Sequence, residues 1–130
     1  MPAAIVISIV DDDRFITDAI GELVRSLGYR TAVFWSAEQF LQSGRIEETA
    51  CLITDLQMPG MSGLDLQMRL RDDGFDTPMI FVSAFPEERY RTRALNAGAV
   101  AFLSKPFEEQ SLVDCISAAL ERGGSHFEPN

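Results

Sequence analysis

The sequence contains little positive charge. Lys and Arg number 11 against 20 Asp and Glu, so the formal net charge is −9 at pH 7. DNA, RNA and anionic membrane surfaces attract clusters of basic side chains, because each presents a dense array of phosphates. We therefore expect no nucleic acid and no membrane among the partners of this domain itself.

Cysteine and histidine are also scarce, with two cysteines, Cys51 and Cys115, and one histidine, His126. Their spacing fits neither a zinc site nor a disulfide framework. No apolar run reaches membrane-spanning length, and residues 1–4 lack the basic start of a signal peptide. We expect a cytoplasmic protein with two reduced, buried thiols, and His126 receives no role.

Apolar residues make up 46% of the 130 residues, which is sufficient for the core of one globular domain. Apolar periodicity predicts strands over residues 5–10, 30–35, 50–54, 79–82 and 100–103, and helices over 16–27, 36–43, 62–72, 87–96 and 107–121. Alternating strands and helices favour a parallel sheet with helices on both faces. We expect a flavodoxin-like, doubly wound (βα)5 fold with strand order 2-1-3-4-5. The domain would span residues 1–122, and residues 123–130 would form a tail or the start of a linker.

Polar residues collect where the predicted strands end. Asp11 and Asp12 follow the first strand, Asp55 the third, Ser83 the fourth and Lys105 the fifth. Ligands of such sheets bind beyond the carboxyl ends of the strands. In the predicted order the first and third strands are neighbours, so the three aspartates are expected to share one pocket.

This set of residues suits phosphoryl chemistry. Three adjacent carboxylates repel one another unless a cation lies among them, and hard oxygen ligands favour Mg²⁺. Lys105 suits a phosphate oxygen or a carboxylate, and Ser83 offers a hydroxyl donor. The pattern predicts a site where one aspartate attacks phosphorus as the nucleophile. Asp13 is a further candidate ligand, although the role of a helix cap or of a first-turn acid is favoured.

Four motifs stand in order at these strand ends: Val10-Asp11-Asp12, Asp55 followed by Met58-Pro59-Gly60-Met61-Ser62-Gly63, Ser83-Ala84, and Lys105-Pro106. Together they resemble the receiver domain of two-component response regulators, over residues 5 to 121. The turn after Asp55 is most similar to receivers that precede a LuxR-type helix-turn-helix output domain. The resemblance implies a phosphorelay signalling domain that assists its own phosphorylation and dephosphorylation, rather than an enzyme.

The resemblance also assigns roles to the acidic residues. Asp55 would be the phosphoacceptor, with a histidine kinase as the donor. Asp11, Asp12, Asp55 and the main-chain carbonyl of Gln57 would hold Mg²⁺. Gln57 and Phe85 stand at two positions that tune the lifetime of the phosphoryl group in the family.

The remaining motif residues would respond to phosphorylation. Ser83 would bind the phosphoryl group, and Lys105 would pair with one of its oxygens, with a cis Lys105–Pro106 peptide. Phe102 stands at the position of the family's switch aromatic and would move inward with Ser83. This switch would alter the face of the fourth helix, fifth strand and fifth helix, and so promote a homodimer.

Other interpretations stay open at this point. Asp11-x-Asp13 with Ser83 and Lys105 also matches a haloacid-dehalogenase-like phosphatase, but Asp55 would then have no role. A pseudo-receiver would lack the acceptor, the acid pair or the lysine, and all of these are present. The chain could be a stand-alone regulator or the receiver of a longer regulator with a DNA-binding output domain.

Overall fold

The computed structural model describes residues 5–84 and 87–125. Five strands alternate with five helices in this part of the chain. In chain order they are β1 (Val6–Val10), α1 (Arg14–Ser26), β2 (Arg30–Phe34), α2 (Ala37–Gln42), β3 (Thr49–Thr54), α3 (Gly63–Asp72), β4 (Met79–Ser83), α4 (Glu88–Asn96), β5 (Ala101–Ser104) and α5 (Glu109–Ser125).

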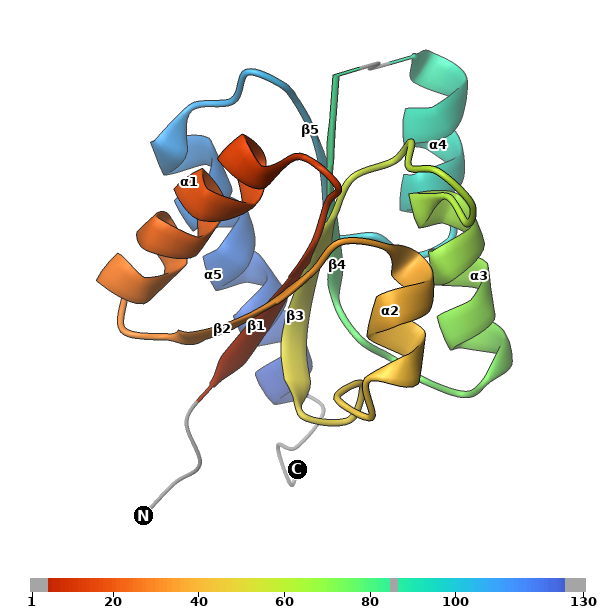
Figure 1. Cartoon of the computed structure of the whole chain (residues 1–130), viewed down its shortest axis with the longest axis horizontal. Coiled ribbons are helices and arrows are strands. Elements are labelled where there is room, and N and C mark those ends of the chain that lie inside the picture. The colour runs from red at the N-terminus through yellow and green to blue at the C-terminus, as the bar shows by residue number, and fades with distance from the viewer. Residues whose placement is uncertain (1–4, 85–86, 126–130) are drawn as a thin grey trace.

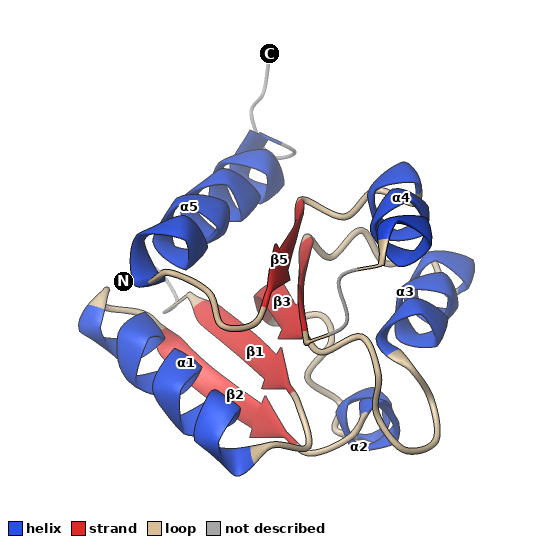
Figure 2. Ribbon diagram, turned by 90° about the horizontal axis from the view of Figure 1, so that it is seen from above, coloured by secondary structure: helices blue, strands red, loops and turns tan. Residues whose placement is uncertain are grey.

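The strands form one parallel sheet in the order β2-β1-β3-β4-β5. Helices α1 and α5 cover one face of the sheet, and α2, α3 and α4 cover the other (Figures 1 and 2). The doubly wound (βα)5 fold predicted from the sequence is therefore confirmed. Because all strands are parallel, their carboxyl ends lie along one edge of the sheet.

The sheet is buried on both faces because alternate strand residues point to opposite sides. In β1, Ile7 and Ile9 belong to the core beneath α1 and α5, whereas Val6 and Val10 belong to the core beneath α2, α3 and α4. This arrangement explains why the strands appear in the sequence as continuous apolar runs. Both cysteines are free, but only Cys51 is buried; Cys115 is half-buried at the margin of the core, contrary to the prediction.

The predicted element boundaries hold within about two residues except at the end of α5. Helix α1 begins at Arg14, because Asp13 caps it one residue earlier. Helix α5 begins at Glu109 and continues to Ser125, through the glycine pair at 123–124 and beyond the end expected at residue 121. A glycine stops a helix when it takes a positive φ, as Gly28, Gly74 and Gly98 do here, but it also adopts helical angles. The domain limit at residue 122 stays a prediction, and His126 lies outside the described residues.

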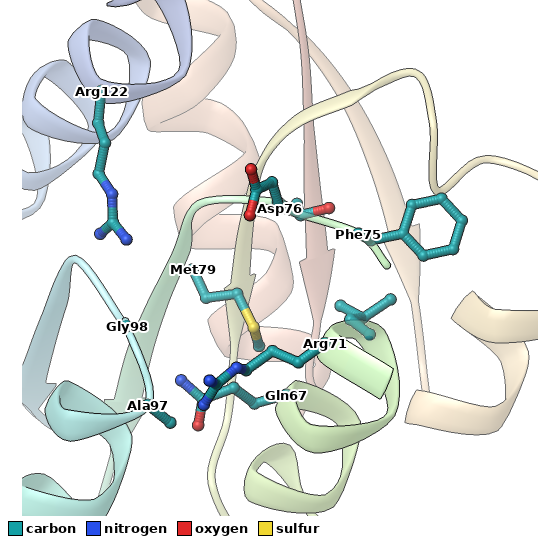
Figure 3. A pocket seen from close by; sticks show the side chains of 10 residues that line it. Gln67, Arg71, Phe75, Asp76, Met79, Ala97, Gly98 and Arg122 are labelled. Carbon is teal, nitrogen blue, oxygen red and sulfur yellow. The ribbon is translucent and has the colours of Figure 1, made fainter. Parts of the chain in front are cut away.

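A small pocket of about 80 Å³ lies at the opposite edge of the sheet (Figure 3). Its walls come from α3, the loop that precedes β4, the loop that follows α4, and the end of α5, with Gln67, Arg71, Met79 and Arg122 among its lining residues. Met79 begins β4, whereas Ser83 ends it. The pocket is therefore separate from the predicted acidic site.

No helix among the described residues is long and apolar enough to cross a membrane.

Candidate functional site

Main-chain hydrogen bonds beyond the strands bring the predicted site residues to one edge of the sheet. The N–H groups of Asp11, Asp55 and Lys105 each donate to a carbonyl on the neighbouring strand, at 3.1, 2.9 and 2.8 Å respectively. The acceptor for Asp55 is Val10, and the acceptor for Lys105 is Ser83. Each site residue is thus fixed beside the end of an adjacent strand.

The three predicted acidic residues form one cluster. One carboxylate oxygen from each of Asp11, Asp12 and Asp55 lies within 4.8 Å of the other two. Asp11 and Asp55 are 2% and 9% exposed, whereas Asp12 is open to solvent. The cluster therefore has a buried base and an open side through which a small ion or a phosphoryl donor could enter.

Lys105 lies against the two buried carboxylates and is the only lysine of the chain. Its Nζ is 2.9 Å from Asp11 Oδ2 and 3.6 Å from Asp55 Oδ2. The Lys105–Pro106 peptide bond is cis, as predicted. Burial opposes the charged form of Lys105, but the two carboxylates outweigh burial and raise its pKa. The lysine is therefore held as a cation between both acids.

Main-chain donors orient the two buried carboxylates. Asp11 Oδ1 accepts a hydrogen bond from the Asp13 N–H at 2.9 Å, and Asp55 Oδ1 accepts one from the Leu56 N–H at 2.7 Å. The Oδ2 atom of each carboxylate faces Lys105. Asp13 itself caps α1 by accepting from the Phe15 N–H at 2.9 Å, as favoured from the sequence.

The cluster lacks sufficient positive charge for its carboxylates. Burial raises the pKa of Asp55 to about 6, and repulsion from Asp11 adds to this effect, while Lys105 opposes it. Burial also raises the pKa of Asp11. Two carboxylates with raised pKa values beside an exposed third one are a donor set that fits a hard divalent cation.

A close contact places α3 directly behind Asp55. Gly63, the first residue of α3, donates its N–H to the Leu56 carbonyl at 2.8 Å. A Cβ atom at residue 63 would overlap the main-chain oxygen of Asp55 and lie 3.0 Å from Phe81 Cε1. Ser62 caps the helix through a reciprocal pair with Asp65, which confirms the predicted helix start. Glycine is therefore required where the loop returns to the sheet.

The predicted switch residues occupy β4 and β5. Ser83 is fully buried at the end of β4. Phe102 is 5% exposed and stacks on Phe81 with ring centroids 6.1 Å apart. An Arg91 guanidinium nitrogen of α4 donates to the Phe102 carbonyl at 3.3 Å. Helix α4 is thereby linked to β5, the strand that carries Phe102. Phe85 lies outside the described residues.

The sequence did not predict one contact to the loop that follows Asp55. Glu38 Oε2 of α2 accepts a hydrogen bond from the Met61 N–H at 2.9 Å. The two residues are 23 positions apart in the chain. A glutamate in the first turn of a helix is also common for a local reason, because its negative charge interacts favourably with the positive end of the helix dipole. Nothing in the local pattern around Glu38 indicates a partner in another loop.

A comparison with known proteins decides the family. Residues 7–117 match the model of the response regulator receiver domain. The chain belongs to this family. Membership identifies the domain as a signalling domain and removes the phosphatase interpretation, in which Asp55 had no role.

Two regulators and one solved structure illustrate the similarity. The response regulator protein TodT of Pseudomonas putida is 43% identical over 118 residues, which cover 91% of this chain and 52% of TodT. The transcriptional regulatory protein FixJ of Azorhizobium caulinodans is 30% identical over 122 residues, which cover 94% of this chain and 58% of FixJ. The response regulator StyR superimposes with a TM-score of 0.89 at 38% identity, over 95% of this chain and 63% of StyR. The chain thus spans about half the length of the curated relatives it matches.

Proposed function

We propose that this receiver domain accepts a phosphoryl group on Asp55 from the phosphohistidine of a histidine kinase. The observation that carries the proposal is the position of Asp55, a carboxylate with a raised pKa in an acidic cluster whose only nearby cation is Lys105 among the described residues. If the site were only a structural ion pair, the excess negative charge of the cluster would have no explanation. A site that attracts a cation and then a phosphoryl group explains it.

The phosphoryl transfer is a displacement at phosphorus. A carboxylate oxygen of Asp55 forms the new P–O bond, the P–N bond of the donor breaks, and the imidazole nitrogen keeps its electron pair. Lys105 Nζ, 3.6 Å from Asp55 Oδ2, stabilises negative charge on the transferred group. The hydrogen bond from the Leu56 N–H holds the other Asp55 oxygen in place during the attack.

The cluster fits Mg²⁺ because its donor atoms are carboxylate oxygens and because one side of it is open to solvent. Asp11, Asp12, Asp55 and the main-chain carbonyl of Gln57 are the proposed ligands. Held by these ligands, the ion would supply positive charge that offsets the charge of the carboxylates and of the incoming phosphoryl oxygens. Asp11 keeps its second oxygen on the Asp13 N–H, so its carboxylate is oriented before any ion arrives.

Ser83 and Phe102 are proposed to transmit the event to the surface. The Ser83 hydroxyl would bind the new phosphoryl group and favour the buried position of Phe102. Arg91 of α4 donates to the Phe102 main-chain carbonyl, so a shift of the β5 backbone at Phe102 would reach α4. Phosphorylation would thus shift an existing equilibrium on the face of α4, β5 and α5 and promote a homodimer. Gln57 and Phe85 are proposed to tune the lifetime of the phosphoryl group.

The output is proposed from the relatives. TodT is named as a response regulator and FixJ as a transcriptional regulatory protein, and this chain covers about half of each. We propose that a LuxR-type DNA-binding output domain is the partner of this receiver. We also propose that the histidine kinase donates the phosphoryl group to the receiver in the cytoplasm.

The proposed acceptor is tested by borohydride reduction, which converts an aspartyl phosphate into homoserine. After treatment with acetyl phosphate and Mg²⁺, peptide mapping should find homoserine at position 55 alone. Homoserine at position 11 or 12 would contradict the proposal. Sedimentation of intact protein before reduction should show a dimer only after phosphorylation, and equal sedimentation with and without the donor would exclude the proposed dimer.

A further inference from the structure

The loop between Asp55 and α3 contacts α2 through one carboxylate. Glu38 Oε2 accepts from the Met61 N–H at 2.9 Å, and Glu38 is half-buried. The same oxygen lies 2.6 Å from the place where a Cβ atom of residue 60 would stand. Gly60 has φ +79, so this turn favours glycine for its backbone angle, and a side chain there would displace the Glu38 carboxylate.

The first turn of α2 is well fixed, so it can hold Glu38 in place. The Ser36 hydroxyl accepts from the Gln39 N–H at 3.0 Å, and the Gln39 side chain accepts from the Trp35 N–H at 2.6 Å. Ser36 and Gln39 flank Glu38 on this turn. The Glu38 carboxylate is therefore presented to the loop from a helix start that Ser36 and Gln39 cap.

The loop is held by main-chain hydrogen bonds near its two ends. The Asp55 N–H donates to Val10 on β1, and the Gly63 N–H closes the loop by donating to Leu56. Met61 lies between these bonds, and Glu38 is its side-chain acceptor. Gln57, whose carbonyl is a proposed Mg²⁺ ligand, belongs to the same short segment.

We propose that Glu38 is a positioning residue for the phosphoacceptor site. Its carboxylate holds the Gly60–Met61 peptide, and through it the loop segment that contains Gln57. The role toward the metal rests on the proposed function, because Gln57 is a ligand only there. Glu38 touches neither the metal nor the phosphoryl group; it acts through the loop.

The competing explanation is that Glu38 only favours the dipole of α2 as a first-turn acid. That role requires negative charge but no contact with the loop. Two substitutions separate the explanations. Glu38→Ala removes both the charge and the acceptor, whereas Glu38→Gln removes the charge and keeps a carbonyl oxygen that can accept from Met61. Glu22→Ala, at an exposed position of α1, is the matched control.

The first measurement is amide hydrogen exchange across residues 56–63 without added metal. We expect faster exchange in Glu38→Ala, exchange near that of the wild type in Glu38→Gln, and no change in Glu22→Ala. Equal exchange in Glu38→Ala and the wild type would overturn the proposal. Because this readout needs neither Mg²⁺ nor phosphorylation, it judges the contact independently of the proposed function.

The second measurement is the Mg²⁺ dissociation constant by calorimetry. Residues that orient a ligand typically change metal affinity by about 10- to 100-fold when mutated. We expect a loss at the lower end, on the order of tenfold, in Glu38→Ala and substantial rescue in Glu38→Gln. Equal losses in both variants would overturn the positioning role, because charge rather than the hydrogen bond would be responsible.

The wild type serves as the control for the metal site itself. If the wild type binds no Mg²⁺, the metal part of the proposed function fails, and the role of Glu38 toward the metal fails with it. If the wild type binds Mg²⁺ and Glu38→Ala binds it equally well, only the role of Glu38 fails.

Discussion

Lys105 lies closer to Asp11 than to the proposed acceptor Asp55, with Nζ–Oδ2 distances of 2.9 and 3.6 Å. Its principal partner before phosphorylation is therefore the Asp11 carboxylate at the end of β1, two strands away from β4, the neighbour of β5. Asp11 holds the lysine in place while leaving it within reach of a group on Asp55. The site thus keeps its cation oriented without neutralising the acceptor completely.

Replacement of Lys105 by methionine is expected to raise the pKa of Asp55 further above its ordinary range. Burial and Asp11 already raise this pKa to about 6, and Lys105 is the main group that opposes them. The measurement is a carboxyl-carbon NMR titration of metal-free protein. A pKa of Asp55 that stayed the same in Lys105→Met would show that the lysine does not act on the acceptor.

Asp55→Asn is expected to stabilise the metal-free protein at neutral pH. The folded pKa of about 6 lies above the unfolded value of 3.8, so the folded protein favours protonated Asp55. Stability from this group is complete below pH 3.8 and is lost as the pH rises through about 6. One pKa unit corresponds to about 1.4 kcal/mol, so an amide should add roughly 1–3 kcal/mol to the free energy of unfolding at pH 7.

Urea denaturation at pH 7 and pH 4 tests this sign, because the gain should shrink at the lower pH, where Asp55 is largely protonated. Asp18→Asn, at an exposed position of α1, is the control and should change little. A loss of stability in Asp55→Asn at neutral pH would contradict the electrostatic account of the cluster.

Gly63→Ala is expected to destabilise the fold by roughly 2 kcal/mol or more, because overpacking against rigid groups typically costs about 1–3 kcal/mol. The new methyl group would overlap the main-chain oxygen of Asp55. In Gly21→Ala the new atom would meet only the flexible end of Arg25, and alanine is the better helix former. Thermal or urea unfolding of the two variants should therefore show opposite trends, and equal stabilities would refute the close approach of α3.

Phe102→Ala is expected to lower the free energy of unfolding by about 3 kcal/mol or more, as is typical of a buried phenylalanine. Phe102 is 5% exposed, whereas Phe15, on α1, is 87% exposed. Phe15→Ala should therefore stay within about 0.5 kcal/mol of the wild type. If both variants unfolded at the same urea concentration, Phe102 would not occupy the inward position in solution.

The sequence predicted the parts of this molecule that depend on local order. Apolar runs marked the strands, and polar residues directly after those runs marked the edge where Asp11, Asp12 and Asp55 meet. Parallel strands bring their carboxyl ends together, so positions at strand ends were sufficient to predict the cluster. The cap formed by Asp13 was predictable because it depends on one hydrogen bond between residues close together in the chain.

The sequence did not predict features that depend on contacts between distant segments. Glu38 reaches Met61 across 23 positions, and an acid in a first helical turn has an adequate local explanation. The preference of Lys105 for Asp11 depends on distances across the strand ends, which composition does not contain. The end of α5 was misplaced because glycine is compatible with both a helix and its termination.

The most direct test of the phosphoacceptor is intact-mass analysis after treatment with acetyl phosphate. Wild type, Asp55→Asn and Asp18→Asn would each be treated with and without Mg²⁺. We expect the mass of one phosphoryl group on the wild type and on Asp18→Asn, only with Mg²⁺, and none on Asp55→Asn. Full labelling of Asp55→Asn, or labelling of the wild type without Mg²⁺, would contradict the account.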